Sequence, residues 1–335
     1  MRLISWLSLC LLVLSPVSAQ EPPGDPVAGG DIRDMEAVVV SGAQPGPGLW
    51  KVYSGEHTLY ILGTLSPLPT RMEWRSQQVA SVLDEAGVVL GPPGISIGTG
   101  MGMLRSLTLL PSALRATNNP DGETLEDVLP ADVYARWSAL KARYIGRDRG
   151  IEKKRPMFAA AELYAKAVKR IGLRGGVVGP VIEEALKRRK MKQTSTVLAL
   201  TIDDPRDALA EFRGEHARQE DIDCFSRTMD IVEHGLPDMV ARANAWAVGD
   251  IDALRSMPIE SQYRACLSAW SSSEVVRKRG MTDIDQRVRA HWMEVAESSL
   301  REHEVVFATL PIAELLRPGG YVELLTAKGY EIESP

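Results

Sequence analysis

The chain has 335 residues, of which 44% are hydrophobic and 25% are charged. Its formal net charge of −5 argues against a nucleic acid as the main partner, because nucleic-acid-binding domains are usually basic. Two basic segments, 152–156 and 186–192, are predicted to be solvated helix ends, where cations lie near the negative end of the helix dipole.

Residues 1–19 have the pattern of a secretory signal peptide. Arg2 supplies a positive charge, 3–14 is an apolar run too short to span a bilayer, and 17–19 is a small-residue cleavage site. Cleavage is predicted after Ala19, which places the mature protein in the periplasm or in the medium. No later segment has the length of a membrane span without charges, so no integral membrane segment is expected after cleavage.

The residues that follow divide into a leader and a domain. Segment 20–48 contains several Pro and Gly and few large apolar residues, which predicts a flexible leader. Residues 49–335 are enough for one large domain with a substantial core.

The first predicted elements of this domain are a hairpin, a helix and a strand. Segments 49–55 and 57–64 are rich in β-branched and aromatic residues and predict the hairpin. Apolar residues at helical spacing predict a helix over 74–86, which leads into a short buried strand at 87–90.

A long helical middle follows, from about residue 121 to 190. Thr124 and Asp127 form a capping box, and Pro130 with Asp132 starts the next helix. A strand is predicted at 194–202, and 205–300 is again mostly helical.

The end of the chain returns to strands. The predicted elements are a strand at 304–310, helices over 312–318 and 321–329, and a strand at 330–334. Strands at both ends of the chain around a long helical middle predict an α/β domain, with a central mixed sheet flanked by helices and completed by the two ends.

Cys224 and Cys266 are the pair of cysteines left after removal of Cys10 with the signal peptide. An even number of cysteines in an oxidising compartment predicts a disulfide bond. Two buried free thiols are the alternative, because sequence does not give the geometry.

Segment 94–98, GISIG, matches the G-x-S-x-G nucleophile elbow with Ser96 at its centre. Pro92 and Pro93 separate it from the preceding strand, and the residues after it are Gly-rich, so a flexible loop is favoured over a serine nucleophile. The histidines that could complete a triad all lie in charged, helical stretches: His216, His234, His291 and His303. A dinucleotide-binding loop is excluded, because Met103 stands where the third glycine would be.

The histidine spacings do not predict a metal site. His57 lies beside the hairpin turn and is expected to be solvent-exposed. His291 and Glu294 share a helix face, but a lone pair of this kind is more often surface decoration than a ligand set.

The two ends of the chain resemble the TraB/GumN family, which includes the Tiki-type metalloproteases. The opening LWKVYSGEHTLYILGTLSPLP is similar to a family hairpin whose second strand ends in Gly-Thr-x-His, and the closing VVFATLPIAELLRPGGYVELLTAKGYEIE is similar to a strand ending in Gly-x-x-His, a Gly-led helix and a final strand. The middle segments ETLEDVLPADVY, KKRPMFAAAELYAK and IEEALKRRK follow the family in order and spacing, so the resemblance covers 49–335.

The resemblance implies an α/β fold and metal-dependent peptide hydrolysis. In the family, the two motif histidines and a glutamate at the end of the next strand would hold a divalent ion that activates water. In this chain Gly63 and Thr64 are kept, but Ser66, Gly91 and Glu314 stand at the three ligand positions.

Other motif positions also differ. Pro311 stands in place of the glycine of the last motif, Val178 in place of an acidic residue, and Val288 in place of an asparagine. Arg287 keeps the arginine that the family carries on its penultimate helix.

A serine hydroxyl is a poor ligand for zinc or manganese, and one carboxylate does not make a tight site. Ser66 is therefore predicted to cap the turn before Pro67, and the leading hypothesis is a pseudoenzyme that works as a binding or accessory protein of the cell envelope. It would need no cofactor, and its partner would be a protein, a peptide or an envelope component. The first alternative is a metal-dependent hydrolase with an altered site built on Ser66, Arg287 and Glu314, and the second is a serine hydrolase through Ser96.

Overall fold

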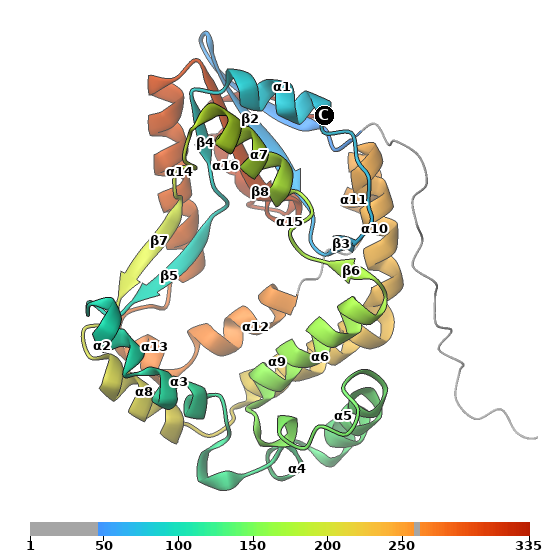
Figure 1. Cartoon of the computed structure of the whole chain (residues 1–335), viewed down its shortest axis with the longest axis vertical. Helices are drawn as coiled ribbons and strands as arrows, with labels where there is room; N and C mark the ends of the chain where they lie inside the picture. The colour runs from blue at the N-terminus through green and yellow to red at the C-terminus, as the bar shows by residue number, and fades with distance from the viewer. Residues whose placement is uncertain (1–45, 258–261) are drawn as a thin grey trace, which may run out of the picture. The chain divides into compact units, whose positions relative to one another are not determined.

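A computed structural model describes residues 46–257 and 262–335 (Figure 1). The predicted signal peptide and the predicted leader up to residue 45 lie outside the described residues. Among the residues that the structure describes, no helix combines the length and apolar character needed to cross a membrane.

The largest sheet in the described part of the chain has five strands in the order β4-β8-β2-β1-β9. Its strands are β1 (Leu49–Ser54), β2 (His57–Thr64), β4 (Val88–Leu90), β8 (Val305–Pro311) and β9 (Glu331–Glu333). β2 runs parallel to β8 and antiparallel to β1, so the sheet is mixed. Because β8 and β9 come from the C-terminal end and β1 and β2 from the N-terminal end, the predicted fold class is confirmed.

The predicted hairpin forms because the turn and the strand pattern agree. Gly55 adopts a φ of +61°, a conformation that glycine tolerates without a steric penalty. Val52 lies opposite Leu59 in the register, and both side chains are fully buried. The paired apolar face anchors the hairpin in the core of the sheet.

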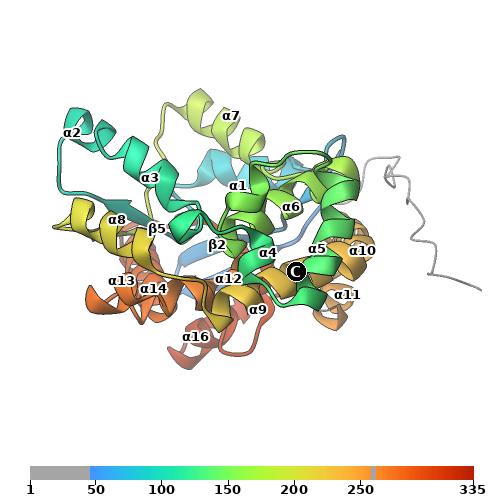
Figure 2. The same ribbon diagram turned by 90° about the horizontal axis from the view of Figure 1, so that it is seen from below.

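Helices cover both faces of this sheet. Figure 2 shows α1 (Gln77–Glu85) and α7 (Gly179–Arg189) on one side, and α14 (Ile284–Glu302) and α16 (Tyr321–Ala327) on the other. The inner strand β8 is buried on both faces, and its residues pack into one core with those of β2 and the covering helices. Such two-sided burial is typical of strands that pair in parallel.

The helical middle has a core of its own. It is built from α4 (Leu125–Val128), α5 (Ala131–Tyr144), α6 (Pro156–Arg170), α9 (Gln219–Asp230) and α10 (Leu236–Val248). Trp137 and Phe225 meet at its centre, with ring centroids 5.2 Å apart. The capping box is confirmed, since the main-chain N–H of Thr124 donates to the Asp127 carboxylate at 2.7 Å.

Shorter elements complete the described chain. They are β3 (Leu68–Pro69), β6 (Leu173–Arg174), α8 (Pro205–Gly214), α11 (Ile251–Ser256), α12 (Gln262–Ser271), α13 (Glu274–Lys278) and α15 (Ile312–Leu316).

The prediction of a flexible loop at 94–98 is wrong. This segment is strand β5 (Gly94–Gly98), which pairs in parallel with β7 (Val197–Thr201). Two short helices follow it, α2 (Met103–Leu107) and α3 (Leu110–Ala116), where no helix was predicted. The pairing partner of β5 lies about a hundred residues away in the chain, which a local pattern does not reveal.

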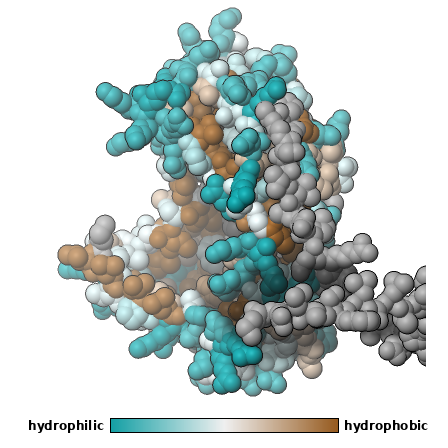
Figure 3. All heavy atoms as spheres, turned by 45° about the vertical axis from the view of Figure 1, so that its right-hand side comes forward, coloured by the Kyte–Doolittle hydropathy of each residue, from teal (hydrophilic) through white to brown (hydrophobic). Residues whose placement is uncertain are grey.

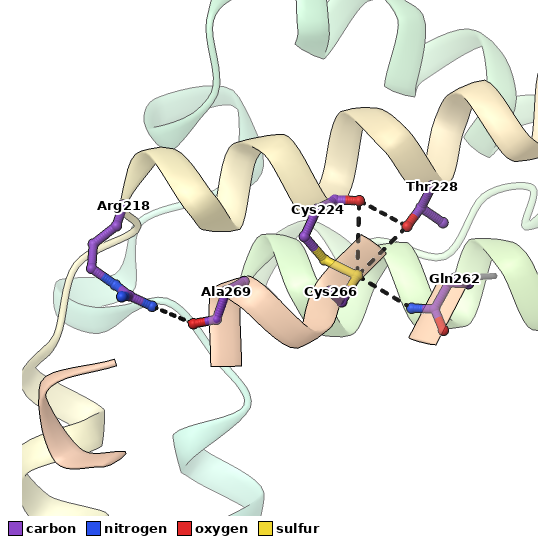
Figure 4. The surroundings of a disulfide bond; sticks show 6 residues. All are labelled: Arg218, Cys224, Thr228, Gln262, Cys266 and Ala269. Atoms are coloured by element: carbon purple, nitrogen blue, oxygen red, sulfur yellow. Dashed lines mark hydrogen bonds between the residues drawn. A yellow bond between two sulfur atoms is a disulfide. The ribbon is translucent and has the colours of Figure 1, made fainter. Parts of the chain in front are cut away.

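The predicted disulfide bond is confirmed. Cys224 on α9 is bonded to Cys266 on α12, and both cysteines are buried (Figure 4). Nearby, Thr228 donates its hydroxyl to the Cys224 carbonyl at 2.8 Å, and Arg218 donates to the carbonyl of Ala269 at 2.7 Å. The disulfide bond and the Arg218 contact join α9 and the residue before it to α12, whereas the Thr228 bond lies within α9.

The prediction that segment 152–156 is solvated is wrong for Arg155. Arg155 lies immediately before α6, and its side chain is buried. It donates to the main-chain oxygens of Phe212 on α8 and of Glu215 just after α8. Likewise, Arg189 in the second basic segment donates to the carbonyls of Leu83 and Ala86 at the end of α1. Both arginines tie neighbouring elements together.

Candidate functional site

The carboxyl ends of β2 and β8 form one wall of a cavity of about 510 Å³. These strands are parallel neighbours, with Thr64 opposite Pro311, so the segments that follow them lie side by side. Ser66 follows β2, Glu314 lies on α15 after β8, and both line the cavity. The expectation that the two family motifs meet at one pocket is confirmed.

A second cavity of about 270 Å³ adjoins the same strand ends. Ser66 lines both cavities, and Val178 and Gln193 line the second. Gly91 directly follows β4 and lies close by, since a Cβ atom built on it would lie 3.5 Å from Cδ of Gln193. The structure therefore brings Ser66, Gly91 and Val178 together around one strand end, while Glu314 faces the larger cavity.

Glu314 is held between two arginines. Its Oε1 accepts from Arg264 at 2.7 Å and its Oε2 from Arg317 at 2.5 Å, and its side chain is 18% exposed. Asp285 pairs with Arg289 at 3.1 Å and lies 3.5 Å from Arg317. The carboxylates at this wall are thus neutralised by guanidinium groups.

Two tyrosines, Tyr164 and Tyr321, are among the residues that line the cavity. Burial raises the pKa of Tyr321 above its ordinary value, and the carboxylate of Glu314 adds to this. Burial also raises the pKa of Tyr164, although the nearby Arg242 opposes the shift. Both hydroxyls therefore stay protonated at neutral pH and can donate hydrogen bonds.

Sequence reasoning missed most of the polar groups that line this cavity. Tyr164, Arg242, Arg264 and Arg289 come from four different helices, α6, α10, α12 and α14. No sequence motif links these four residues. Each lines the cavity only because its helix turns that face toward the cavity.

Ser66 is exposed, and its hydroxyl has no hydrogen-bond partner in the described part of the chain. The predicted cap of the turn before Pro67 is thus not found among these residues. The preceding Thr64 does bond, donating its hydroxyl to the carbonyl of Leu310 at 3.2 Å. The retained threonine therefore ties the end of β2 to β8.

Gly63 is required by close packing. A Cβ atom at this position would lie 2.7 Å from Cζ3 of Trp50 and 3.3 Å from Cδ1 of Ile312. The carbonyl of Gly63 accepts a hydrogen bond of 2.6 Å from the indole N–H of the fully buried Trp246. Gly63 thus allows two tryptophans to fix the strand end that leads to Ser66.

We expect Gly63→Ala to lower the free energy of unfolding by about 1–3 kcal/mol, because an added methyl group overpacks a filled core. Urea denaturation followed by tryptophan fluorescence measures the change. Gly94→Ala is the matched control, since its Cβ would meet nothing closer than 3.7 Å. Equal stability of the two variants would contradict the packing argument.

The retained Arg287 does not line either cavity. It is exposed on α14, whereas Asp285, Val288 and Arg289 on the same helix line the larger cavity. Two residues along a helix correspond to a turn of about 200°, so Arg287 and Arg289 face nearly opposite directions. The arginine that reaches the cavity from α14 is Arg289.

Ser96 does not sit on a nucleophile elbow. It is exposed in the middle of β5, opposite Ala199 of β7, instead of at a turn between a strand and a helix. Of the histidines, His216 lies between α8 and α9, His234 in a π-helical turn at Ile231–Gly235, His291 on α14 and His303 directly after it.

The prediction that His57 is simply solvent-exposed is wrong. It is half-buried, and its Nδ1 lies 2.6 Å from the carbonyl oxygen of Leu300. This contact fixes the start of β2 against the end of α14.

The residues at the family's ligand positions do not fit a divalent metal. Ser66 offers a hydroxyl, Gly91 offers no side chain, and the carboxylate of Glu314 is already paired with arginines. Across residues 46–257 and 262–335, no group of three or more His, Cys, Asp or Glu side chains is placed to hold a metal ion. What the arrangement offers instead is a cavity with apolar walls, tyrosine hydroxyls and arginines.

Comparison with known proteins shows the family of the chain. The sequence profile of the TraB/PrgY/gumN family matches residues 48–334. Searches among curated proteins and among solved structures found no match.

Proposed function

The chain belongs to the TraB/PrgY/gumN family, and from this premise we propose that it is an exported binding or accessory protein of the cell envelope. In this proposal the site that serves metal-dependent hydrolysis in the family has become a binding site. Its ligand would be a protein segment, a peptide or a small component of the envelope.

The state of Glu314 is the observation that carries this proposal. A catalytic metal site needs about three protein ligands and an open position for water. Here the one carboxylate at a ligand position is neutralised by Arg264 and Arg317, which would also repel a divalent cation.

The larger cavity supports a binding role. Its volume of about 510 Å³ is within the range of roughly 300–1,000 Å³ that is common for small-molecule sites. Such sites combine apolar walls with a few polar groups that orient the ligand. Leu65, Ile95 and Leu267 are among the apolar residues of the cavity wall, and Tyr164 and Tyr321 are among its polar residues.

Two observations support export. Residues 1–19 have the composition of a signal peptide, and the Cys224–Cys266 disulfide is typical of an oxidising compartment. N-terminal sequencing of the protein recovered from the periplasm or the medium should give Gln20 as the first residue. Recovery only from the cytoplasm, with Met1 retained, would contradict this part of the proposal.

We expect the purified native protein to carry no stoichiometric metal and to show no chelator-sensitive peptidase activity. Elemental analysis and a peptidase assay with and without EDTA measure the two properties. Peptide cleavage that EDTA abolishes would overturn the proposal.

Restoring the ligands is the complementary test. Ser66→His, Gly91→Glu and Glu314→His, with Pro311→Gly to relax the turn, should create zinc or manganese binding. Gly91 has room for a side chain, since the contacts of its Cβ would be ordinary ones at 3.5 Å or more. The matched control carries Ser66→Ala in place of Ser66→His and should bind at least ten times more weakly.

A further inference from the structure

The surface of α2 and α3 carries an unusual set of exposed leucines. Leu104, Leu107, Leu110 and Leu114 are 82%, 58%, 54% and 61% exposed, and Ile97 on the preceding strand β5 is 48% exposed. Hydrophobic surface gathers at the left of the view in Figure 3, over the region where α2 and α3 lie. We call these five residues the leucine surface.

The spacing of these leucines puts them on one face of a nearly continuous helical run. They are three, three and four residues apart, which is the period of a helix face. Leu109 and Ala116 on the same run are buried, and α3 packs on α8. The run therefore already has a buried face of its own, and the leucine surface is a second apolar face that faces solvent.

Large exposed apolar patches mark interaction sites on soluble proteins. The charge of the chain segment that carries this patch indicates the kind of partner, whereas the neighbouring α8 carries charges of both signs. Segment 86–120 contains no Asp or Glu, although the whole chain has 44 acidic residues and a net charge of −5. The charged residues in this segment are Arg105 and Arg115, both exposed next to the leucines.

We propose that the leucine surface docks onto an anionic lipid bilayer. Short amphipathic helices bind at the bilayer interface with their apolar side chains among the acyl chains and their cations near the headgroup phosphates. The five side chains are far fewer than the roughly 20–30 residues that each partner contributes to a standard protein interface, which argues against a second copy of the chain. The proposal is independent of what the cavity binds.

Flotation of the purified full chain with lipid vesicles tests the proposal. We expect binding to vesicles of phosphatidylglycerol and phosphatidylcholine, much weaker binding to phosphatidylcholine alone, and weakening by salt. Leu104→Ser with Leu107→Ser should lower the partition coefficient by about 100-fold, at about tenfold per leucine. Arg105→Glu with Arg115→Glu should lower it by about tenfold or more.

Val248→Ser is the matched control, because Val248 is an exposed apolar residue on α10 outside the leucine surface. It should leave vesicle binding unchanged, and circular dichroism should show that all variants are folded. Absence of binding by the unaltered chain would overturn the proposal. Binding that the leucine substitutions do not reduce would overturn it too, since another part of the chain would then hold the lipid. A third result would also overturn the proposal. The chain would self-associate in sedimentation velocity, the leucine substitutions would abolish this association, and no vesicles would be bound, because a second copy would then cover the surface.

Discussion

Arg155→Ala is expected to lower the free energy of unfolding by about 3–5 kcal/mol, because it leaves one buried and several partly buried carbonyl acceptors without their donor and opens a cavity. The Arg155 side chain is buried, with the residue 7% exposed. Its guanidinium donates to the carbonyl of Ala116 at 3.0 Å, of Glu215 at 2.7 Å and of Arg213 at 3.2 Å, and also to that of Phe212.

These side-chain bonds add to an isolated antiparallel β-bridge between Asn118 and Lys154 and connect that bridge to the end of α8. Ala116 ends α3, and the other acceptors lie at the end of α8 and just after it. The guanidinium also lies over the ring of Phe212, 4.5 Å from its centroid. Burial lowers the pKa of Arg155, while the charges of Asp221 and Glu215 oppose that shift. The group stays a cation at neutral pH.

Urea denaturation of Arg155→Ala and Arg155→Lys measures the effect. Arg155→Lys should keep less than half of the stability that Arg155→Ala loses. A single ammonium group cannot reach all the acceptors that surround the planar guanidinium group. Arg188→Ala is the control, since Arg188 is exposed and makes one ion pair with Asp84. If Arg155→Ala unfolds at the same urea concentration as Arg188→Ala, the buried network contributes nothing to stability.

Removing the disulfide is expected to lower the free energy of unfolding about as much as Arg155→Ala does. Cys224→Ala with Cys266→Ala should lower the free energy of unfolding by about 3–4 kcal/mol, because the bond limits the freedom of the unfolded chain. The two cysteines are 42 residues apart in sequence, so the bond closes a long loop. Thermal unfolding with and without a reducing agent measures the change.

The same experiment contains its own control. Reductant should destabilise the native chain and leave the alanine variant unchanged, since the variant has no bond between α9 and α12 to break. A native protein that resists fully reducing conditions without loss of stability would show that the bond does not contribute.

The disulfide also has a consequence for the candidate site. Arg264 and Leu267 flank Cys266 on α12, and both line the larger cavity. The bond therefore holds in place the helix that supplies Arg264 to Glu314. Under the proposed function, an oxidising compartment is needed to complete the binding site.

Much of the fold could be predicted from local pattern. The strands around Leu59 and Phe307 are rich in apolar and β-branched residues, and the turn before the first of them contains Gly55, which has a positive φ. The disulfide bond could also be predicted from sequence, because the predicted removal of Cys10 leaves Cys224 and Cys266 as one possible pair. The resemblance of the chain ends to one family placed Ser66 and Glu314 at a shared pocket, which the parallel pairing of β2 and β8 confirms.

Strand pairing and side-chain burial that depend on residues far away in the sequence could not be predicted from local pattern. The strand at 94–98 exists because it pairs with 197–201, and a Gly-rich pentapeptide carries no sign of that partner. Arg155 and Arg287 are both ordinary cations in sequence, yet one is buried and the other is exposed. Which side of a helix is buried is decided by the surface against which it packs.

What the sequence determined by itself, then, is which residues stand at the three positions that the family resemblance marks as metal ligands, namely Ser66, Gly91 and Glu314. What only the tertiary structure decided is the chemistry that is present. Arg264 and Tyr321 lie near Glu314 because α12 and α16 pack beside α15 at the end of β8, whereas Arg317 pairs with Glu314 through their local spacing of three residues. Residue types follow from sequence alone, whereas the distances that turn them into a site follow from long-range packing.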